Sequence, residues 1–174
     1  MKLGIVVCGL NGAGKSTLGK ALASALDAHF IDIESLYFPK PASDYPYASA
    51  RTREEVSRAL FAEVKAHERF VLACVKGNYG EALYPFLQHA VYIKVPRGIR
   101  MRRVRNRSYQ KFGSRMLPGG DLYERERAFF ELAAGRSDGV VEEWLRALAC
   151  PVTRVDGTRP IRENVEFIME QLRH

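Results

Sequence analysis

One glycine-rich segment constrains the fold of this chain more than any other feature. Residues 9–16 read G-L-N-G-A-G-K-S and match the pattern G-x-x-x-x-G-K-[ST] in full. A continuous apolar run, Leu3–Cys8, precedes the segment, and apolar residues recur at helical spacing from Lys15 to Leu26. Glycines let backbone N–H groups converge on phosphate oxygens, and the next helix presents its positive end to the same anion. The segment therefore predicts a phosphate-binding loop between a buried strand and a helix.

Two side chains of this loop carry specific expectations. The Lys15 ammonium should reach the β- and γ-phosphates of a bound nucleotide, and the Ser16 hydroxyl should face Mg²⁺. ATP and Mg²⁺ are therefore the expected cofactors. The residues predicted to hold the phosphates are Gly9, Leu10, Asn11, Gly12, Ala13, Gly14, Lys15, Ser16 and Thr17.

Strand-like and helix-like segments alternate along the whole chain. Apolar, β-prone runs at 3–8, 29–34, 70–75, 90–95 and 152–155 are separated by amphipathic stretches. This alternation predicts an α/β fold in three layers, with a five-stranded parallel sheet covered by helices on both faces. We expect one domain over residues 1–174, with an acceptor-site insertion at about 36–68 and a helical lid at about 108–137.

Two carboxylates mark the end of the second expected strand. Asp32 and Glu34 are two residues apart, so in a strand they would share a face and emerge beside the phosphate-binding loop. One carboxylate can bind Mg²⁺, and another can accept a proton from an attacking hydroxyl. We assign Asp32 to the metal and Glu34 to the acceptor, although either could be the base. Capping of a turn is the structural alternative.

Positive charge is concentrated in one segment. The net charge is +7, and eight cationic side chains without any acid lie between Arg97 and Arg115. The rest of the chain is close to neutral, which favours a local polyanion site over a surface coated for nucleic acid. Arg103 and Arg107 are four residues apart and so would share one helical face.

The cysteine and histidine patterns predict no metal centre. Cys8, Cys74 and Cys150 are odd in number and lack metal-ligand spacing, so we expect reduced, buried thiols. No apolar run approaches the roughly 20 residues that a membrane helix needs, and we expect a cytoplasmic protein without a membrane partner. The histidines, which also lack ligand spacing, are His29, His67, His89 and His174.

Several segments together resemble the nucleoside-monophosphate-kinase and shikimate-kinase branch of P-loop phosphotransferases. The loop at 9–16 is the first, and Asp32-Ile33-Glu34 is similar to the D-x-D of shikimate kinases. Arg103 and Arg107, after Val95-Pro96, look like the R-x-x-x-R of adenylate kinases, and residues 136–138 look like the R-x-D that ends their lid. Residues 156–160 are similar to the final loop beside adenine.

The resemblance implies roles for these residues. Arg103 would stack on adenine, and Arg107 and Arg136 would contact the phosphates and clamp the transferring phosphoryl group. Gly157 and Thr158 would line the adenine pocket through their backbone. The chain departs from both families after the third strand, at 75–80, where it lacks their glycine patterns. Gly77 there still fits a close approach of backbone to acceptor.

The leading hypothesis is an ATP:Mg²⁺-dependent phosphotransferase with a small-molecule acceptor: a nucleoside, a nucleotide or a small alcohol. Asp32 and Glu34 favour a hydroxyl acceptor, whereas cationic side chains favour an anionic one, and the sequence leaves both open. The alternatives are a polynucleotide-end kinase or other nucleic-acid-associated ATPase, and a regulatory ATPase without an acceptor. A monomer or a dimer fits equally well. The cations that favour an anion are Arg51, Arg53, Arg58 and Lys76.

Overall fold

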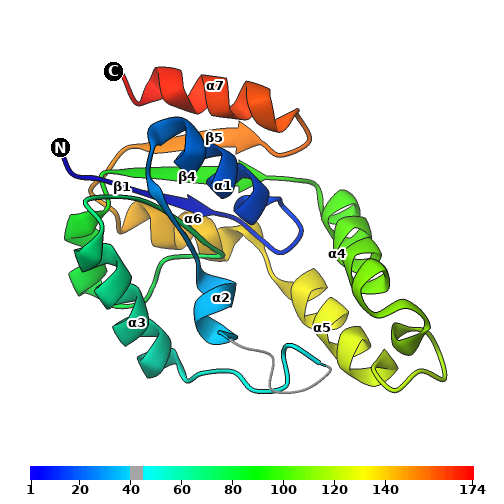
Figure 1. Ribbon diagram of the computed structural model, residues 1–174. Coiled ribbons are helices and arrows are strands. Elements are labelled where there is room, and N and C mark those ends of the chain that lie inside the picture. The colour runs from blue at the N-terminus through cyan, green and yellow to red at the C-terminus, as the bar shows by residue number, and fades with distance from the viewer. Residues whose placement is uncertain (40–44) are drawn as a thin grey trace.

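The computed structural model describes residues 1–39 and 45–174 (Figure 1). Residues 40–44, which belong to the predicted acceptor insertion, lie outside the described part. In the described part, no helix is both long and apolar enough to span a membrane.

Five parallel strands form one sheet, as predicted. Their spatial order is β2-β3-β1-β4-β5, so the strand that leads into the phosphate-binding loop lies in the centre. Each neighbouring pair is parallel, with Cys8 opposite Cys74 on one side and Tyr92 on the other. The strands are β1 (Leu3–Cys8), β2 (His29–Asp32), β3 (Arg69–Cys74), β4 (His89–Lys94) and β5 (Val152–Asp156).

Helices cover both faces of the sheet, which confirms the three-layer prediction. Helices α1 (Lys15–Leu26) and α7 (Ile161–Gln171) lie on one face, and α3 (Arg53–Ala66) and α6 (Asp138–Arg146) lie on the other (Figure 1). Because both faces are covered, the three inner strands β3, β1 and β4 are apolar over most of their length, as in other parallel sheets. Side chains from α1, such as Leu18 and Leu22, are fully buried against β1 and β4.

The carboxyl ends of the strands meet at one edge of the sheet, and the remaining elements gather there. Short helix α2 (Ile33–Tyr37) follows β2, and α4 (Arg97–Phe112) follows β4. Helix α4 and helix α5 (Tyr123–Gly135) form an arm that projects past this edge (Figure 1). The arm contains most of the predicted lid, and its small core includes Met101, Val104 and Ala133. Single 3-10 turns occupy Glu81–Phe86 and Gly113–Met116.

The second strand is shorter than predicted. It ends at Asp32, because the Asp32 carboxylate accepts a hydrogen bond from the Glu34 N–H at 3.0 Å and caps helix α2. The expectation that Asp32 and Glu34 share one strand face is therefore wrong. A capping box formed by Thr52 and Glu55 opens α3, with hydrogen bonds of 2.7 and 3.2 Å.

The cysteines are free thiols in the core or at its margin. Cys8 and Cys74 are buried and Cys150 is half-buried. Burial raises the pKa of the Cys8 thiol to about 12, which keeps it protonated and unreactive at neutral pH.

Candidate active site

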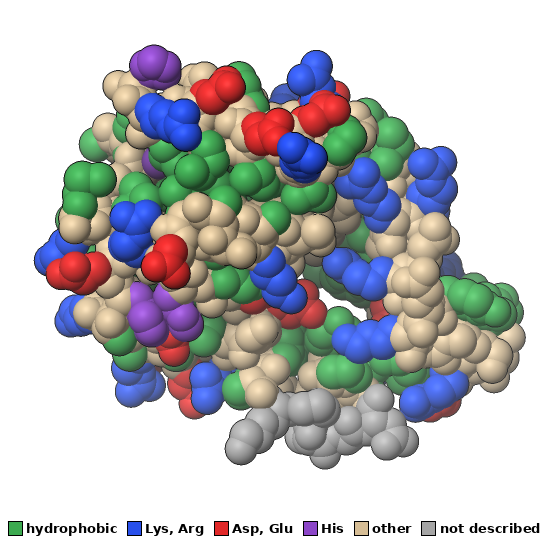
Figure 2. All heavy atoms as spheres, turned by 45° about the horizontal axis from the view of Figure 1, so that its top comes forward, with side chains coloured by type: hydrophobic (Ala, Val, Ile, Leu, Met, Phe, Trp, Pro, Cys, Tyr) green, Lys and Arg blue, Asp and Glu red, His purple; other side chains and the backbone are tan. Residues whose placement is uncertain are grey.

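A cavity of about 660 Å³ opens between the carboxyl edge of the sheet and the α4–α5 arm. Figure 2 shows this hollow, with cationic side chains around its rim. It is bounded by the loop after β1, by α2, by the end of β3 and by both helices of the arm. Eleven of the predicted site residues line it: Leu10, Asn11, Gly12, Gly14, Lys15, Ser16, Thr17, Asp32, Glu34, Arg107 and Arg136.

The loop after β1 has the backbone that its glycines predict. Gly12 and Gly14 have φ values of 80° and 95°, which residues with a Cβ rarely adopt. A Cβ at Gly12 would also collide with the carbonyl oxygen of Arg100. Leu10 is only 2% exposed, and its side chain belongs to the core beneath the loop.

A buried arginine braces this loop from behind. The Arg100 guanidinium donates to the carbonyl oxygens of Val95 and Asn11, both at 3.1 Å, and the residue is almost fully buried. A buried charge needs several hydrogen bonds to offset its desolvation, and these carbonyls supply two of them. Sequence reasoning missed this role, because Arg100 stands among seven other cations of the same segment.

Lys15 is the first residue of α1, and its side chain folds back over the loop. Its Nζ donates to the Leu10 carbonyl at 3.1 Å. Burial, together with the positive charges of Arg107 and Arg136, lowers the pKa of Lys15 to about 8, and the nearby Cys74 and Asp32 oppose this shift. The site thus holds a cation that lacks a fully compensating anion, as a site for phosphate groups would.

Ser16 and Asp32 meet where the sequence predicts a metal. The Ser16 hydroxyl donates to the Asp32 carboxylate at 2.7 Å, so two hard oxygen donors lie side by side next to Lys15. Hydroxyl and carboxylate oxygens are ligands that Mg²⁺ prefers, and the pair fits that ion.

Glu34 reaches the same cavity from helix α2 rather than from β2. Tyr47, which sequence reasoning missed, lies beside it: burial and the adjacent Glu34 carboxylate raise the pKa of the Tyr47 hydroxyl above its ordinary value. The same hydroxyl accepts a hydrogen bond from Lys111 Nζ at 2.9 Å. Tyr47 therefore links the carboxylate of α2 to the end of α4.

Arg136, at the end of α5, ties the arm to the phosphate-binding loop. Its guanidinium donates to Asn11 Oδ1 at 2.7 Å. Arg107 lines the cavity from α4 and acts electrostatically on both Lys15 and Tyr47. The two arginines predicted to face the phosphates therefore come from two different helices of the arm.

Five predicted residues do not line the cavity: Gly9, Ala13, Arg103, Gly157 and Thr158. Arg103 donates to the carbonyl oxygens of Gly12 at 3.3 Å and Gly157 at 3.0 Å, so it joins the phosphate-binding loop to the loop after β5. A Cβ at Gly157 would collide with Val95, which explains the glycine. Thr158 is exposed and its hydroxyl donates to Asp156 at 2.6 Å. Arg103 and Thr158 thus lie beside the loop and outside the cavity, whereas Gly9, Ala13 and Gly157 are buried.

The basic segment does not act as one anion-binding unit. Arg100 and Arg103 bind backbone carbonyls, whereas Arg107 and Lys111 line the cavity. Arg115 pairs with Asp121 at 2.8 Å. The expectation of a single polyanion site along residues 97–115 is therefore wrong, because the cations of this segment have different partners.

Gly77 also has a different role from the expected one. A Cβ there would lie 2.7 Å from the Trp144 ring, so the glycine accommodates the tryptophan of α6 and does not line the cavity. Its neighbour Asn78 does line it.

The cavity wall also contains features that the sequence did not single out. A buried carboxylate, Glu126 of α5, faces the cavity, and burial raises the pKa of that group. Nothing in the sequence distinguishes Glu126 from Glu124 and Glu131 on the same helix. The aromatic wall could have been predicted, because three tyrosines lie close together in the sequence at 37–47. The aromatic side chains on the cavity wall are Tyr37, Phe38, Tyr45, Tyr47, Tyr79, Phe112 and Phe129.

The parallel sheet with a glycine-rich loop after its central strand defines a P-loop nucleotide-binding fold. A family model described as an AAA domain matches residues 5–128. The chain belongs to this family, and its relatives place it among the shikimate-kinase-like P-loop kinases.

Two curated relatives and one solved structure illustrate this placement. The chain is 31% identical over 169 residues to the shikimate kinase of Gloeobacter violaceus, covering 83% of this chain and 92% of that one. It is 29% identical over 180 residues to the uncharacterized protein YqaC of Bacillus subtilis, covering 99% and 98%. The structure of shikimate kinase from Acinetobacter baumannii in complex with shikimate superposes with a TM-score of 0.58 at 16% identity, covering 99% and 93%; this match shows the shared fold.

Proposed function

We propose that the protein transfers the γ-phosphoryl group of ATP, with Mg²⁺, to a small-molecule acceptor. The observation that carries this proposal is the joint placement of Lys15, the Ser16–Asp32 oxygen pair and Glu34 in one cavity beneath the arginines of the arm. Phosphoryl transfer needs positioning and charge stabilisation more than covalent chemistry, and these groups supply both.

Each group has a distinct task in this proposal. The loop N–H groups and Lys15 hold the phosphates, and Ser16 and Asp32 hold Mg²⁺, which when bound neutralises charge on the phosphate oxygens. Arg107 and Arg136 bind the equatorial oxygens of the moving group. Arg103, Gly157 and Thr158 lie outside the cavity, beside the loop, and we assign them to the adenine end of ATP.

The acceptor occupies the far end of the cavity in this proposal. Glu34 accepts the proton of an acceptor hydroxyl, and the aromatic wall favours an acceptor with a ring over an open-chain polyol. The classes to test are nucleosides, nucleoside monophosphates and cyclic alcohols. Shikimate belongs to the last class and is included because a kinase relative is named for it.

The test is a screen for acceptor-stimulated ADP release, followed by ³¹P NMR of the product. We expect one class to raise turnover many-fold and to appear as a phosphate ester or a phosphoanhydride. A basal ATPase that no small molecule stimulates would contradict the proposal and favour a regulatory ATPase. Stimulation by polynucleotide ends alone would favour the nucleic-acid alternative instead.

The pKa of Lys15 predicts how ATP affinity depends on pH. Since the cation is required and its pKa in the free protein is about 8, the charged fraction falls about tenfold between pH 7 and pH 9. We expect the affinity for ATP, measured by calorimetry at constant ionic strength, to fall by about the same factor.

The Lys15→Arg variant is the matched control, because a guanidinium stays charged throughout this range. Its affinity can differ from that of the wild type, but it should not change between pH 7 and pH 9. An equal pH dependence in both proteins would assign the titration to another group.

A further inference from the structure

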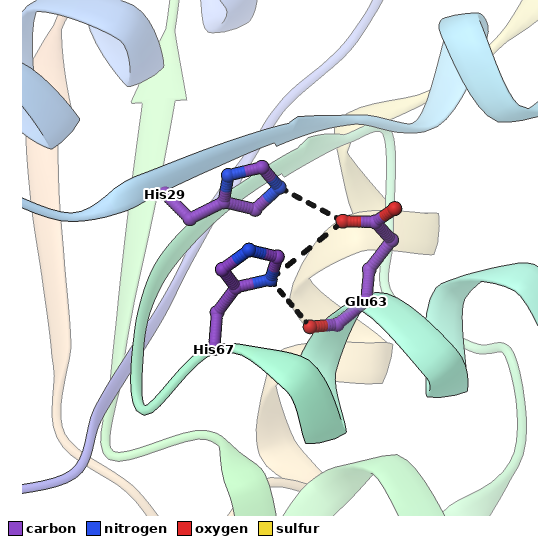
Figure 3. Close-up of side chains that lie close together, drawn as sticks. All are labelled: His29, Glu63 and His67. Atoms are coloured by element: carbon purple, nitrogen blue, oxygen red, sulfur yellow. Dashed lines mark hydrogen bonds and ion pairs between the residues drawn. The ribbon is translucent and has the colours of Figure 1, made fainter.

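Three side chains with metal-ligating atoms lie together at the opposite edge of the sheet from the active site. His29 is the first residue of β2, and Glu63 and His67 belong to the last turn of α3 and its C-cap (Figure 3). Because Asp32 ends the same strand at the edge that carries the cavity, the cluster is separated from the active site by the length of β2. The sequence did not indicate it, since the ligands come from segments that only the fold brings together.

The three side chains converge on one carboxylate oxygen. His29 Nε2 lies 2.8 Å and His67 Nδ1 lies 3.7 Å from Glu63 Oε2. One ligand atom from each residue lies within 4.8 Å of the others. Ligand atoms around a zinc ion lie about 2.0–2.2 Å from the metal, so a small movement brings these three to one ion.

The imidazole rings of His29 and His67 are stacked face to face. Their centroids are 3.6 Å apart and their planes differ by 9°.

We propose that His29, Glu63 and His67 bind one divalent transition-metal ion of the zinc class, with water at the fourth position. Two imidazoles and one carboxylate are a donor set that suits such ions, whereas Mg²⁺ prefers oxygen ligands alone. The site is therefore chemically distinct from the Ser16–Asp32 pair.

Binding requires one local adjustment. The lone pairs of parallel rings do not meet at a point, so one ring must tilt. All three side chains are between 37% and 39% exposed, so a tilt disturbs no core packing. His67 Nδ1 also contacts the Glu63 carbonyl oxygen at 2.9 Å, and water at this surface can replace that contact.

The bound ion would reinforce a link between β2 and α3 that now consists of the contact between His29 and Glu63. Among the described residues, strand β2 lies at the edge of the sheet and pairs only with β3. An ion held by β2 and the end of α3 would link the edge strand to the helix that covers it. It would therefore raise the thermal stability of the folded chain, and it would take no part in phosphoryl transfer.

The test is a zinc titration of tag-free protein in excess Mg²⁺, with a chromogenic chelator as competitor. We expect one zinc per chain in the wild type. We expect His29→Ala and His67→Ala to weaken zinc binding by at least about 100-fold, because even outer-shell changes cost 10–100-fold. His174→Ala is the matched control at an exposed histidine and should bind zinc as the wild type does. Cys150→Ser tests the half-buried thiol and should bind equally.

A second measurement guards against loss of folding. Melting curves without metal show whether each variant is folded, and zinc should raise Tm in the wild type and in His174→Ala but not in His29→Ala. The proposal is overturned if folded His29→Ala and His67→Ala retain wild-type affinity, or if the wild type binds no zinc. Binding that is lost only in Cys150→Ser would also overturn it.

Discussion

Replacement of Lys15 by alanine should abolish ATP turnover and leave the fold intact. Lys15, the first residue of α1, lines the cavity beside the phosphate-binding loop. An arginine finger, which is another positioned cation, contributes about 10³–10⁵ in rate in related systems, and we expect a loss of that order. The fold should tolerate the change, because burial already lowers the pKa of Lys15 to about 8 and so disfavours its charged form without a ligand. Below that pH, the alanine variant should have an equal or slightly higher Tm.

The measurement pairs steady-state ADP release with a thermal melt of the same preparation. Lys65→Ala is the matched control, because this exposed lysine near the end of α3 lies outside the cavity and should turn over ATP as the wild type does. Near-normal turnover in a folded Lys15→Ala protein would remove the assigned role of the lysine and, with it, the main support for the phosphotransferase.

The sheet could be predicted from the sequence because burial of its strands leaves a clear apolar pattern. Strands covered on both faces must be apolar throughout, so β1, β3 and β4 appear as continuous runs between polar segments. The phosphate-binding loop was readable because its glycines serve local backbone geometry, which depends on neighbours in the chain. The pairing of Ser16 with Asp32 then followed from the rule that ligands bind at the carboxyl edge of parallel strands.

The features that escaped prediction depend on contacts between distant segments. The spacing of Asp32 and Glu34 suits a strand as well as a helix N-cap, and only the chain path shows that the cap is used. Arg100 looks like its cationic neighbours until the loop that it braces is placed beside it. Tyr47 is one of many tyrosines until Lys111 and Glu34 approach it from separate elements.

Replacement of Glu34 by glutamine should slow phosphoryl transfer to a hydroxyl acceptor while leaving ATP affinity unchanged. Glutamine keeps the size and hydrogen-bonding capacity of the side chain but cannot accept the acceptor proton. A positioned general base contributes about 10²–10⁴ in rate, and we expect a loss of that order in acceptor-stimulated kcat. Because Glu34 is not part of the Ser16–Asp32 pair, Mg²⁺-dependent ATP binding should persist.

Asp32→Asn provides the contrast that separates the two carboxylates. Loss of a charge beside Ser16 should raise the Mg²⁺ concentration needed for half-maximal turnover, whereas Glu34→Gln should lower kcat at every Mg²⁺ concentration. The pH profile distinguishes a base from a merely structural residue, since loss of the base removes the acidic limb of the kcat profile. If the Glu34→Gln profile keeps that limb and the acceptor-stimulated rate is unchanged, Glu34 is only part of the first turn of α2, and an acceptor hydroxyl must lose its proton to another group.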